Sequence, residues 1–185
     1  VGMGGIMLKG MEQSRADRVV AEAVERGVNY FDVAPTYGDA ELKLGPALKP
    51  YRKDVFLACK TNERSHEGAA EKIEASLKNL QTDYFDLYQL HEMRHVETVD
   101  QVFSKGGAMA TLLAAKASGQ IRHLGLSAHS EEAAIAAMDR YDFDSVLFPL
   151  NFACWLKRDF GPGILRKVEE KGITALAIKS MAKQR

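Results

Sequence analysis

Four ionisable side chains stand at or just after the ends of three successive apolar runs in the sequence. Asp32 lies near the end of the first run, and Tyr37 follows it by five residues; Lys60 lies near the end of the next run, and His91 directly follows the third. A lysine that becomes buried needs a carboxylate partner, and Asp32 can supply one. Each residue alone has an ordinary explanation as a turn, surface or loop residue. Because these residue types transfer protons in enzymes, their grouping predicts a shared functional site.

A second motif overlaps this group. His91-Glu-Met-Arg-His95 satisfies the H-E-x-x-H pattern, in which two histidines hold zinc and the glutamate acts on a metal-bound water. That chemistry needs both histidines on one helical turn. Here His91 ends a strand-like run, and Val96 and Val99 indicate that a helix begins only after the motif. No third ligand follows at a familiar spacing, so we expect no metal at this motif.

The elements that must position these residues form a repeating pattern. Short runs rich in β-branched and aromatic residues alternate with longer amphipathic segments. Most runs are apolar on both faces, which favours parallel strands covered by helices. Helix ends are indicated by a capping-box-like start at Ser14–Asp17, a cap at Ser130, Pro162 in a first turn and a stop at Gly172. The predicted strands are Gly4–Leu8, Asn29–Ala34, Val55–Thr61, Tyr84–Leu90, His123–Ala128, Ser145–Leu150 and Thr174–Met181.

Repeated strand–helix units imply parallel strands joined by right-handed crossovers, in a doubly wound sheet or a (β/α)8 barrel. A dinucleotide-binding doubly wound sheet carries G-x-G-x-x-G after its first strand, whereas Met7 occupies the third glycine position here, and no P-loop motif occurs. We therefore expect an α/β fold of the (β/α)8 TIM-barrel type, formed by residues 1–185 as a single domain. The barrel is expected to be incomplete, because the sequence gives seven strands and six helices where a full barrel takes about 250 residues.

Composition excludes several classes of protein. The 25 Lys and Arg residues balance 25 Asp and Glu, which removes the electrostatic reason to expect nucleic acid or an anionic membrane surface as a partner. No apolar run approaches the ~20 residues of a membrane-spanning helix, and the Gly-rich N-terminal stretch lacks the basic region of a signal peptide. Two cysteines cannot form a disulfide framework or a cysteine-only metal cage. We expect a cytoplasmic protein.

The sequence around the four ionisable residues resembles one family. Gly27-Val-Asn-Tyr-Phe-Asp-Val-Ala-Pro-Thr-Tyr-Gly38 is similar to the second-strand signature of the aldo-keto reductases. Phe56–Thr61, Tyr84–His91 and Gly119–Ser127 are similar to the third, fourth and fifth strands of that family. The resemblance covers nearly the whole chain and implies an oxidoreductase that reduces aldehydes or ketones to alcohols. The expected cofactor is NADP(H), with NAD(H) as the alternative, and the expected partner is a small carbonyl compound.

By this resemblance the catalytic tetrad is Asp32, Tyr37, Lys60 and His91. Tyr37 would donate a proton to the developing alkoxide, although a free tyrosine, with a pKa near ~10, is a poor acid at neutral pH. The ammonium of Lys60 favours tyrosinate and so lowers the cost of that donation. Asp32 would hold Lys60 in place and keep it charged. His91 would donate a hydrogen bond to the carbonyl oxygen and orient it over the hydride.

The resemblance is weaker around the cofactor. The family often has an aromatic residue after the seventh strand, where this chain reads Ala177–Met181, and an asparagine where this chain has Ala128. The expected sixth-strand glutamine falls near Leu147. The segments that usually bind the adenosine 2′-phosphate are absent from the 185 residues, so we expect this stretch to bind NADPH weakly. The implied cofactor contacts are Gly4, Gly5, Asp32, Ser127, Asn151 and Lys179.

Two other functions stay open at this point. Some proteins of this fold bind a nicotinamide cofactor yet serve as sensors or subunits, since a fold does not fix a function. A zinc hydrolase acting through His91-Glu92-x-x-His95 is the other alternative. Turnover of any aldehyde with NADPH would separate an enzyme from a sensor. The sequence names neither the carbonyl substrate nor the oligomeric state.

Overall fold

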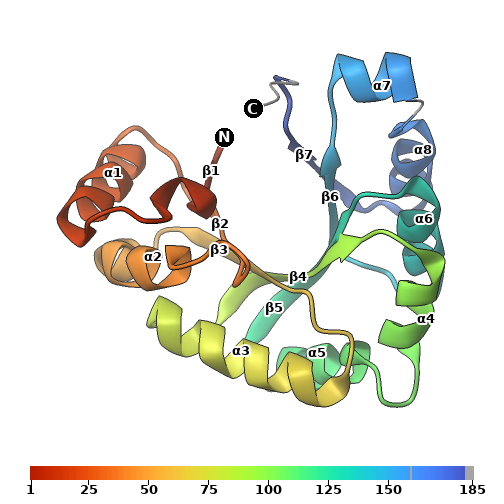
Figure 1. Cartoon of the computed structure of the whole chain (residues 1–185), viewed down its shortest axis with the longest axis horizontal. Helices are drawn as coiled ribbons and strands as arrows, with labels where there is room; N and C mark the ends of the chain where they lie inside the picture. The colour runs from red at the N-terminus through yellow and green to blue at the C-terminus, as the bar shows by residue number, and fades with distance from the viewer. Residues whose placement is uncertain (159, 182–185) are drawn as a thin grey trace.

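A computed structural model of the chain describes residues 1–158 and 160–181. Its centre is one seven-stranded sheet in the order β1-β2-β3-β4-β5-β6-β7, with every neighbouring pair parallel. The sheet curls into an arc whose edges are β1 and β7 (Figure 1), which confirms the expected incomplete barrel of TIM type. The strands are β1 Gly2–Gly4, β2 Tyr30–Asp32, β3 Phe56–Thr61, β4 Phe85–Met93, β5 Ile121–Ala128, β6 Ser145–Pro149 and β7 Thr174–Ile178.

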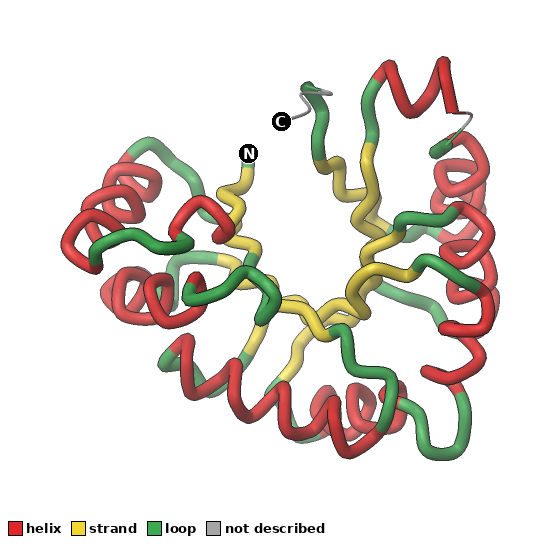
Figure 2. The backbone as a smooth tube through the Cα atoms, viewed as in Figure 1, coloured by secondary structure: helices red, strands yellow, loops and turns green. Residues whose placement is uncertain are grey.

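The helices lie on the outer side of the arc, and the strands line its inner side (Figure 2). This arrangement follows from the right-handed crossover between consecutive parallel strands. Short 3-10 helices, η1 over Gly5–Leu8 and η2 over Lys49–Tyr51, accompany the first two crossovers. The α-helices are α1 Gln13–Glu25, α2 Ala40–Leu48, α3 His66–Leu80, α4 Val96–Phe103, α5 Ala108–Ala117, α6 Glu131–Arg140, α7 Phe152–Arg158 and α8 Pro162–Lys171.

The middle strands are buried on both faces, as the sequence predicted. All but one of the residues of β3, and likewise of β4, are buried. Residues on the outer face, such as Phe31, Leu57 and Tyr88, join the main hydrophobic core. On the inner face, Tyr30 stacks on Phe56 with ring centroids 5.4 Å apart, and the Phe56 ring lies 6.3 Å from that of His123. These rings line the inner side of the arc near the amino ends of the strands, beside a pocket of about 360 Å³.

The first predicted strand is wrong in its position. Residues Gly4–Leu8 were expected to be extended, but β1 is Gly2–Gly4 and the following four residues form the 3-10 helix η1. Ile6 and Met7 are exposed, with 48% and 61% of their surface accessible, and only Leu8 of the apolar residues enters the core. A run exposed on one side cannot be a strand buried on both faces. The prediction of a strand at Gly4–Leu8 was wrong because it used only the apolar composition of the run.

Other boundaries test the predicted helix and strand ends. Ser130 caps α6 by accepting a hydrogen bond from the amide of Ala133, Pro162 lies in the first turn of α8, and Gly172 ends that helix with φ +66°, all as expected. The expected start at Ser14 is wrong, because α1 begins at Gln13 and has no side-chain cap. Strand β7 ends at Ile178 rather than at Met181.

Two helices, α2 and α7, were not recognised in the sequence. Helix α2 contains Gly45 and Pro46, residues that usually interrupt a helical pattern. Gly45 is required by packing, because a Cβ atom there would lie 2.4 Å from the backbone oxygen of Asn79 in α3. The glycine therefore allows α2 and α3 to approach more closely than any side chain would permit. Glu41 of α2, which is buried, accepts hydrogen bonds across this contact from Ser76 and Asn79, at 2.8 and 3.0 Å.

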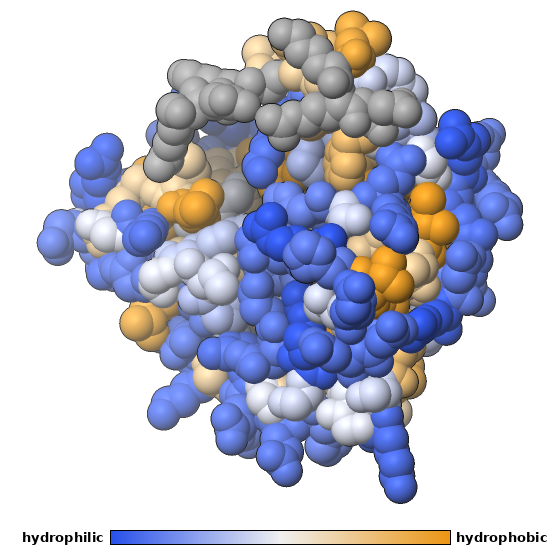
Figure 3. Space-filling view, turned by 45° about the vertical axis from the view of Figure 1, so that its right-hand side comes forward, coloured by the Kyte–Doolittle hydropathy of each residue, from blue (hydrophilic) through white to orange (hydrophobic). Residues whose placement is uncertain are grey.

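The face of the molecule seen in Figure 3 is mostly hydrophilic, with a few separate apolar patches. Within residues 1–158 and 160–181, no helix is long and apolar enough to cross a membrane.

The amino ends of β3, β4 and β5 are fastened together by Asp86. Its carboxylate accepts hydrogen bonds from the amide of Leu57, from Arg52 at 2.9 Å and from Arg122 at 2.8 Å. The two guanidinium groups lie 4.0 and 3.9 Å from the ring centroid of Tyr84. Only 7% of the Asp86 side chain is accessible, so its interactions are shielded from solvent. This group stabilises the end of the sheet where the strands begin.

We expect Asp86→Ala to lower the free energy of unfolding by about 3 kcal/mol, because it leaves the Leu57 amide and the largely buried Arg52 without their partner. Urea unfolding followed by circular dichroism measures this loss. The control is Asp100→Ala, which removes the solvent-exposed ion pair with Arg140 and should cost less than about 1 kcal/mol. Equal losses for the two variants would contradict the assigned role of Asp86.

Candidate active site

Lys60 and Asp32 form a buried ion pair at the carboxyl ends of their strands. Lys60 lies on β3 with 1% of its side chain accessible, and its Nζ donates a hydrogen bond to Oδ2 of Asp32, on β2. The other carboxylate oxygen, Oδ1, accepts a hydrogen bond from Nε2 of Gln89 at 3.2 Å. Gln89 is paired in register with Lys60 across β3 and β4. Three adjacent strands therefore contribute to one buried charged group.

Tyr37 lies above this pair, in the loop between β2 and α2. The loop turns back on itself, since the amide of Tyr37 donates to the carbonyl of Ala34 at 3.0 Å and Gly38 has φ +65°. The ring centroid of Tyr37 lies 5.4 Å from Nζ of Lys60. Burial raises the pKa of the Tyr37 phenol, and this effect outweighs the lowering of its pKa by Lys60. In the protein alone, Tyr37 is therefore a protonated phenol at neutral pH.

His91 completes the group from β4. This strand extends to Met93, so His91 lies within it rather than after it, which corrects the predicted end at Leu90. Its ring meets the Tyr37 ring edge-on at a centroid distance of 6.1 Å. Its Nδ1 lies 2.8 Å from Oδ1 of Asn62, and its backbone oxygen accepts a hydrogen bond from Arg64 at 2.6 Å. Burial and the nearby Lys60 lower the pKa of His91 to about 4.

These side chains open into one cavity at the carboxyl ends of the strands, where chemistry is placed in TIM barrels. Its volume is about 490 Å³, within the ~300–1,000 Å³ usual for small-molecule sites. Tyr37, Lys60 and His91 line it together with Ser127 and Lys179. The structure thus brings the four residues of the predicted tetrad together, three on the cavity wall and Asp32 beneath Lys60.

The remaining residues predicted to contact a cofactor are placed differently. Gly4 and Asp32 line an adjoining opening between β1 and β7, which shares Leu147 and Ile178 with the cavity. Gly5 is buried against Val33, where a Cβ atom would come within 3.0 Å. Both ends of the Asn151 amide are used inside the protein: Nδ2 donates to the carbonyl of Lys179 at 3.0 Å, and Oδ1 accepts from the amide of Cys154 at 2.9 Å. Asn151 caps the start of α7 in this arrangement and does not line the cavity.

Three residues near the site were not found by sequence reasoning: Asn62, Arg64 and Gln89. Gln89 had a detectable signal, because it lies two residues before His91 and therefore on the same face of β4. Asn62 likewise lies two residues after Lys60. Arg64, in the loop that follows, had no pattern to indicate its contact with β4.

The H-E-x-x-H motif lies on a strand end and not on a helix. His91 is within β4, Glu92 has a left-handed backbone with φ +55°, and His95 directly precedes α4. Over residues 1–158 and 160–181, no three His, Cys, Asp or Glu side chains are close enough together to hold a metal ion. The helical arrangement that a zinc protease requires is thus not formed.

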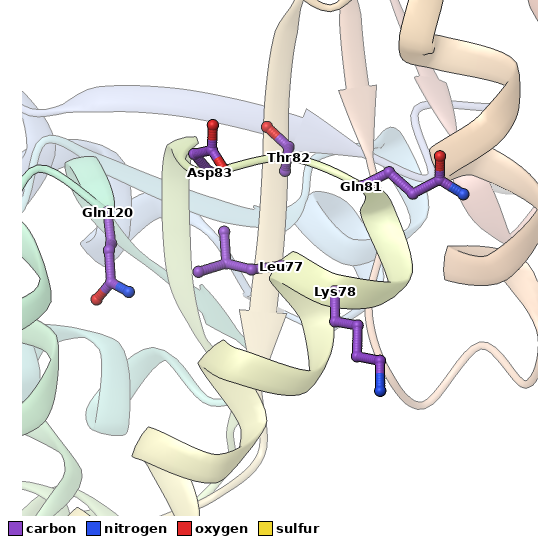
Figure 4. A pocket seen from close by; sticks show the side chains of 6 residues that line it. All are labelled: Leu77, Lys78, Gln81, Thr82, Asp83 and Gln120. Carbon is purple, nitrogen blue, oxygen red and sulfur yellow. The ribbon is translucent and has the colours of Figure 1, made fainter.

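A second pocket lies at the opposite end of the sheet, where α3 ends and the chain approaches β5 (Figure 4). Its lining, Leu77, Lys78, Gln81, Thr82, Asp83 and Gln120, is mostly polar. It lies apart from the four residues at the carboxyl ends of the strands, and we assign it no role.

Comparison with known proteins places the chain in a family. Residues 1–185 match the model of the aldo/keto reductase family. The chain is similar to the uncharacterized oxidoreductase YqkF of Bacillus subtilis, with 35% identity over 69% of this chain and 44% of that protein. It is also similar to the aldo-keto reductase YhdN of the same organism, with 29% identity over 98% of this chain and 56% of the relative. The protein belongs to the aldo/keto reductase family, and the chain spans about half the length of these relatives.

Solved structures of the same class have the same fold. One is a putative aldo-keto reductase from Pseudomonas aeruginosa, with a TM-score of 0.84 and 24% identity, covering 99% of this chain and 74% of that one. Another is the holo form of the aldo-keto reductase AKR11C1 from Bacillus halodurans, with a TM-score of 0.77 and 26% identity, covering 96% of this chain and 60% of that one.

The low pKa of His91 predicts that stability depends on pH. In the unfolded chain this histidine binds a proton below about pH 6.5, whereas in the folded protein it stays neutral down to about pH 4. Between these values the unfolded state binds more protons, so the free energy of unfolding falls as the pH is lowered from 6.5 towards 4. Urea unfolding at several pH values measures the slope. His91→Gln should give a shallower slope in this window, and an unchanged slope would contradict the assignment.

Proposed function

We propose that the protein is an NAD(P)H-dependent oxidoreductase that reduces an aldehyde or ketone to an alcohol, with Tyr37 as the proton donor. The observation that carries this proposal is the buried Lys60–Asp32 pair, which lies below Tyr37 and beside His91 at the wall of one cavity. Membership of the aldo/keto reductase family supports oxidoreduction with a nicotinamide cofactor. The names of YqkF and YhdN agree with that class of reaction.

The cavity fits a nicotinamide and a small carbonyl compound. Ser127 and Lys179 line the same space as Tyr37 and His91, and they would hold the cofactor there. When bound, the reduced cofactor supplies the hydride. Asn151 makes one hydrogen bond at each end of its amide within the protein and does not line this cavity.

The protein's own part is to deliver a proton to the substrate oxygen. Tyr37 carries that proton, since its phenol is neutral at pH 7. Loss of the proton leaves a tyrosinate, and the ammonium of Lys60, 5.4 Å from the ring centroid, stabilises that negative charge. Asp32 pairs with the ammonium of Lys60 and fixes its position, while Gln89 holds the second oxygen of the carboxylate. Burial raises the pKa of Tyr37 and so opposes loss of its proton. Lys60 lowers that pKa and partly offsets the effect of burial.

His91 contributes to the reaction by helping to place the substrate oxygen. Its edge-on contact with Tyr37 places its ring beside the phenol at the cavity wall. A substrate oxygen that reaches the Tyr37 hydroxyl would therefore also lie near His91. Because the two rings come from different elements, β4 and the loop after β2, they would hold the oxygen from two sides. Such fixed positioning lowers the barrier by reducing the orientational freedom of the reactants.

We expect Tyr37→Phe to lower the rate of aldehyde reduction about 10²- to 10⁴-fold, the range usual for loss of a general acid. Cofactor affinity should stay within a factor of two or so, because the phenol acts on the substrate oxygen. Oxidation of NADPH and of NADH with a panel of aldehydes measures the rate, and nucleotide fluorescence measures binding.

Tyr141→Phe is the matched control, since Tyr141 follows α6, away from the cavity. This control should keep full activity. Equal activity of Tyr37→Phe and the unmodified protein would show that another group supplies the proton. Cofactor binding without turnover of any aldehyde would favour the alternative role of a nicotinamide-binding sensor or subunit.

A further inference from the structure

The ring of His91 is held by an asparagine that the proposed function does not use. Asn62 directly follows β3, and the register of Thr61 with Leu90 brings it beside His91. Its Oδ1 lies 2.8 Å from Nδ1 of His91. The backbone of His91 is also fixed, because its carbonyl accepts a hydrogen bond from Arg64.

The orientation of the Asn62 amide is set by its other neighbour. Nδ2 of Asn62 donates to Oε2 of Glu92 at 3.4 Å, and Oε1 of Glu92 accepts from Arg94 at 3.2 Å. Burial raises the pKa of Glu92, but Arg94 and the nearby histidines together lower it below its usual value, so this side chain is an ionised carboxylate. An ionised carboxylate can only accept hydrogen bonds. The NH₂ group of Asn62 therefore faces Glu92, and its oxygen faces His91.

This orientation determines which ring nitrogen of His91 carries the hydrogen. The amide oxygen can only accept, so Nδ1 must be the donor. A neutral imidazole has one N–H, and therefore Nε2 has a free electron pair. With a pKa of about 4, His91 is neutral at pH 7. Within the described part of the chain, Nε2 has no hydrogen-bonding partner.

We propose that Asn62 is a positioning residue that fixes His91 in the Nδ1–H tautomer, so that Nε2 accepts a hydrogen bond from a hydroxyl group bound in the cavity. The inference rests on the proposed function, because it concerns a ligand of the same cavity. It differs from the role expected from the sequence, in which His91 donates to a carbonyl oxygen. An alcohol satisfies both rings, since its O–H donates to Nε2 while its oxygen accepts from Tyr37.

A carbonyl compound has no hydrogen to donate to Nε2. For His91 to donate to it, the amide of Asn62 has to turn, which exchanges its oxygen for its NH₂ group and moves the ring hydrogen to Nε2. The turn breaks the contact with Glu92, which at 3.4 Å is long for a hydrogen bond and therefore weak. Asn62 thus sets whether the site prefers the alcohol or the carbonyl form of its ligand.

The tautomer is tested directly by ¹⁵N NMR of histidine-labelled protein at pH 7, with His91→Gln used to assign the signals. We expect a protonated Nδ1 and an unprotonated Nε2. Asn62→Leu removes the acceptor and should shift the hydrogen towards Nε2, whereas Asn62→Asp keeps an acceptor and should keep Nδ1–H. Asn79→Leu, which removes the hydrogen bond between Asn79 of α3 and Glu41 of α2, is the matched control and should leave the His91 signals unchanged.

A protonated Nε2 in the unmodified protein would overturn the inference, as would an unchanged tautomer in Asn62→Leu. This measurement needs no turnover, so it stands or fails separately from the proposed function. If Asn62→Leu does not fold, Glu92→Gln tests the same point, because it removes the acceptor-only carboxylate and should produce a mixture of tautomers. A single Nδ1–H tautomer in Glu92→Gln would overturn the role assigned to the Asn62–Glu92 contact.

The preference for a hydroxyl is tested with benzyl alcohol as an inhibitor of benzaldehyde reduction. Asn62→Leu should weaken inhibition by benzyl alcohol about tenfold, the effect of losing one hydrogen bond, and should not raise the KM for benzaldehyde. Benzyl alcohol should inhibit the Asn62→Asp variant as strongly as it inhibits the unmodified protein. Equal inhibition constants for Asn62→Leu and the unmodified protein would contradict the acceptor role of Nε2.

Discussion

The ammonium of Lys60 has to be buried with its charge, and much of the sheet is arranged around that requirement. Moving an ion out of water costs several kcal/mol even after the protein relaxes. Asp32 from β2 offsets this cost through the ion pair, and Gln89 from β4 satisfies the second carboxylate oxygen. The pair can form only if the three strands keep their register. A shift of one residue would turn Lys60 towards the helices and leave Asp32 without its partner.

The two ends of the strands carry different kinds of interaction. At the amino ends, Asp86 joins two arginines and a backbone amide. At the carboxyl ends, Tyr37 and His91 each present a polar atom to a cavity. A TIM barrel commonly separates stability from chemistry in this way. In this protein no residue takes part in both, since none of the groups bound to Asp86 lines the cavity at the other end.

Much of the fold follows from the sequence because the strands of a parallel sheet are apolar on both faces. Six of the seven strands were found within a few residues of their observed bounds, and their order gave the architecture. The error at Gly4–Leu8 arose because composition does not show which side chains reach solvent. Helix α2 was missed because Gly45 and Pro46 weaken the local helical pattern, while its close packing on α3 depends on residues far away in the sequence.

The same reasoning explains what could be predicted of the site. Asp32, Lys60 and His91 follow from strand ends, which align whenever the sheet is parallel. Arg64 acts through a contact between the loop after β3 and the backbone of His91, and one sequence contains no signal for such a contact. The resemblance implied Asn151 as a cofactor contact, whereas in the structure its amide caps α7 and lies outside the lining of the cavity. Residue type and approximate position are insufficient when the backbone competes for the same side chain.

Gly45 also influences a part of the molecule that it does not touch. Helix α2 begins at Ala40, whose amide donates to the carbonyl of Tyr37 at 3.3 Å. The middle of α2 packs against α3 at Gly45, and its first turn is hydrogen-bonded to the loop that carries Tyr37. A side chain at position 45 would push α2 outward and tilt that loop. The close packing at Gly45, on the outside of the barrel, is thus connected through α2 to the loop that carries Tyr37.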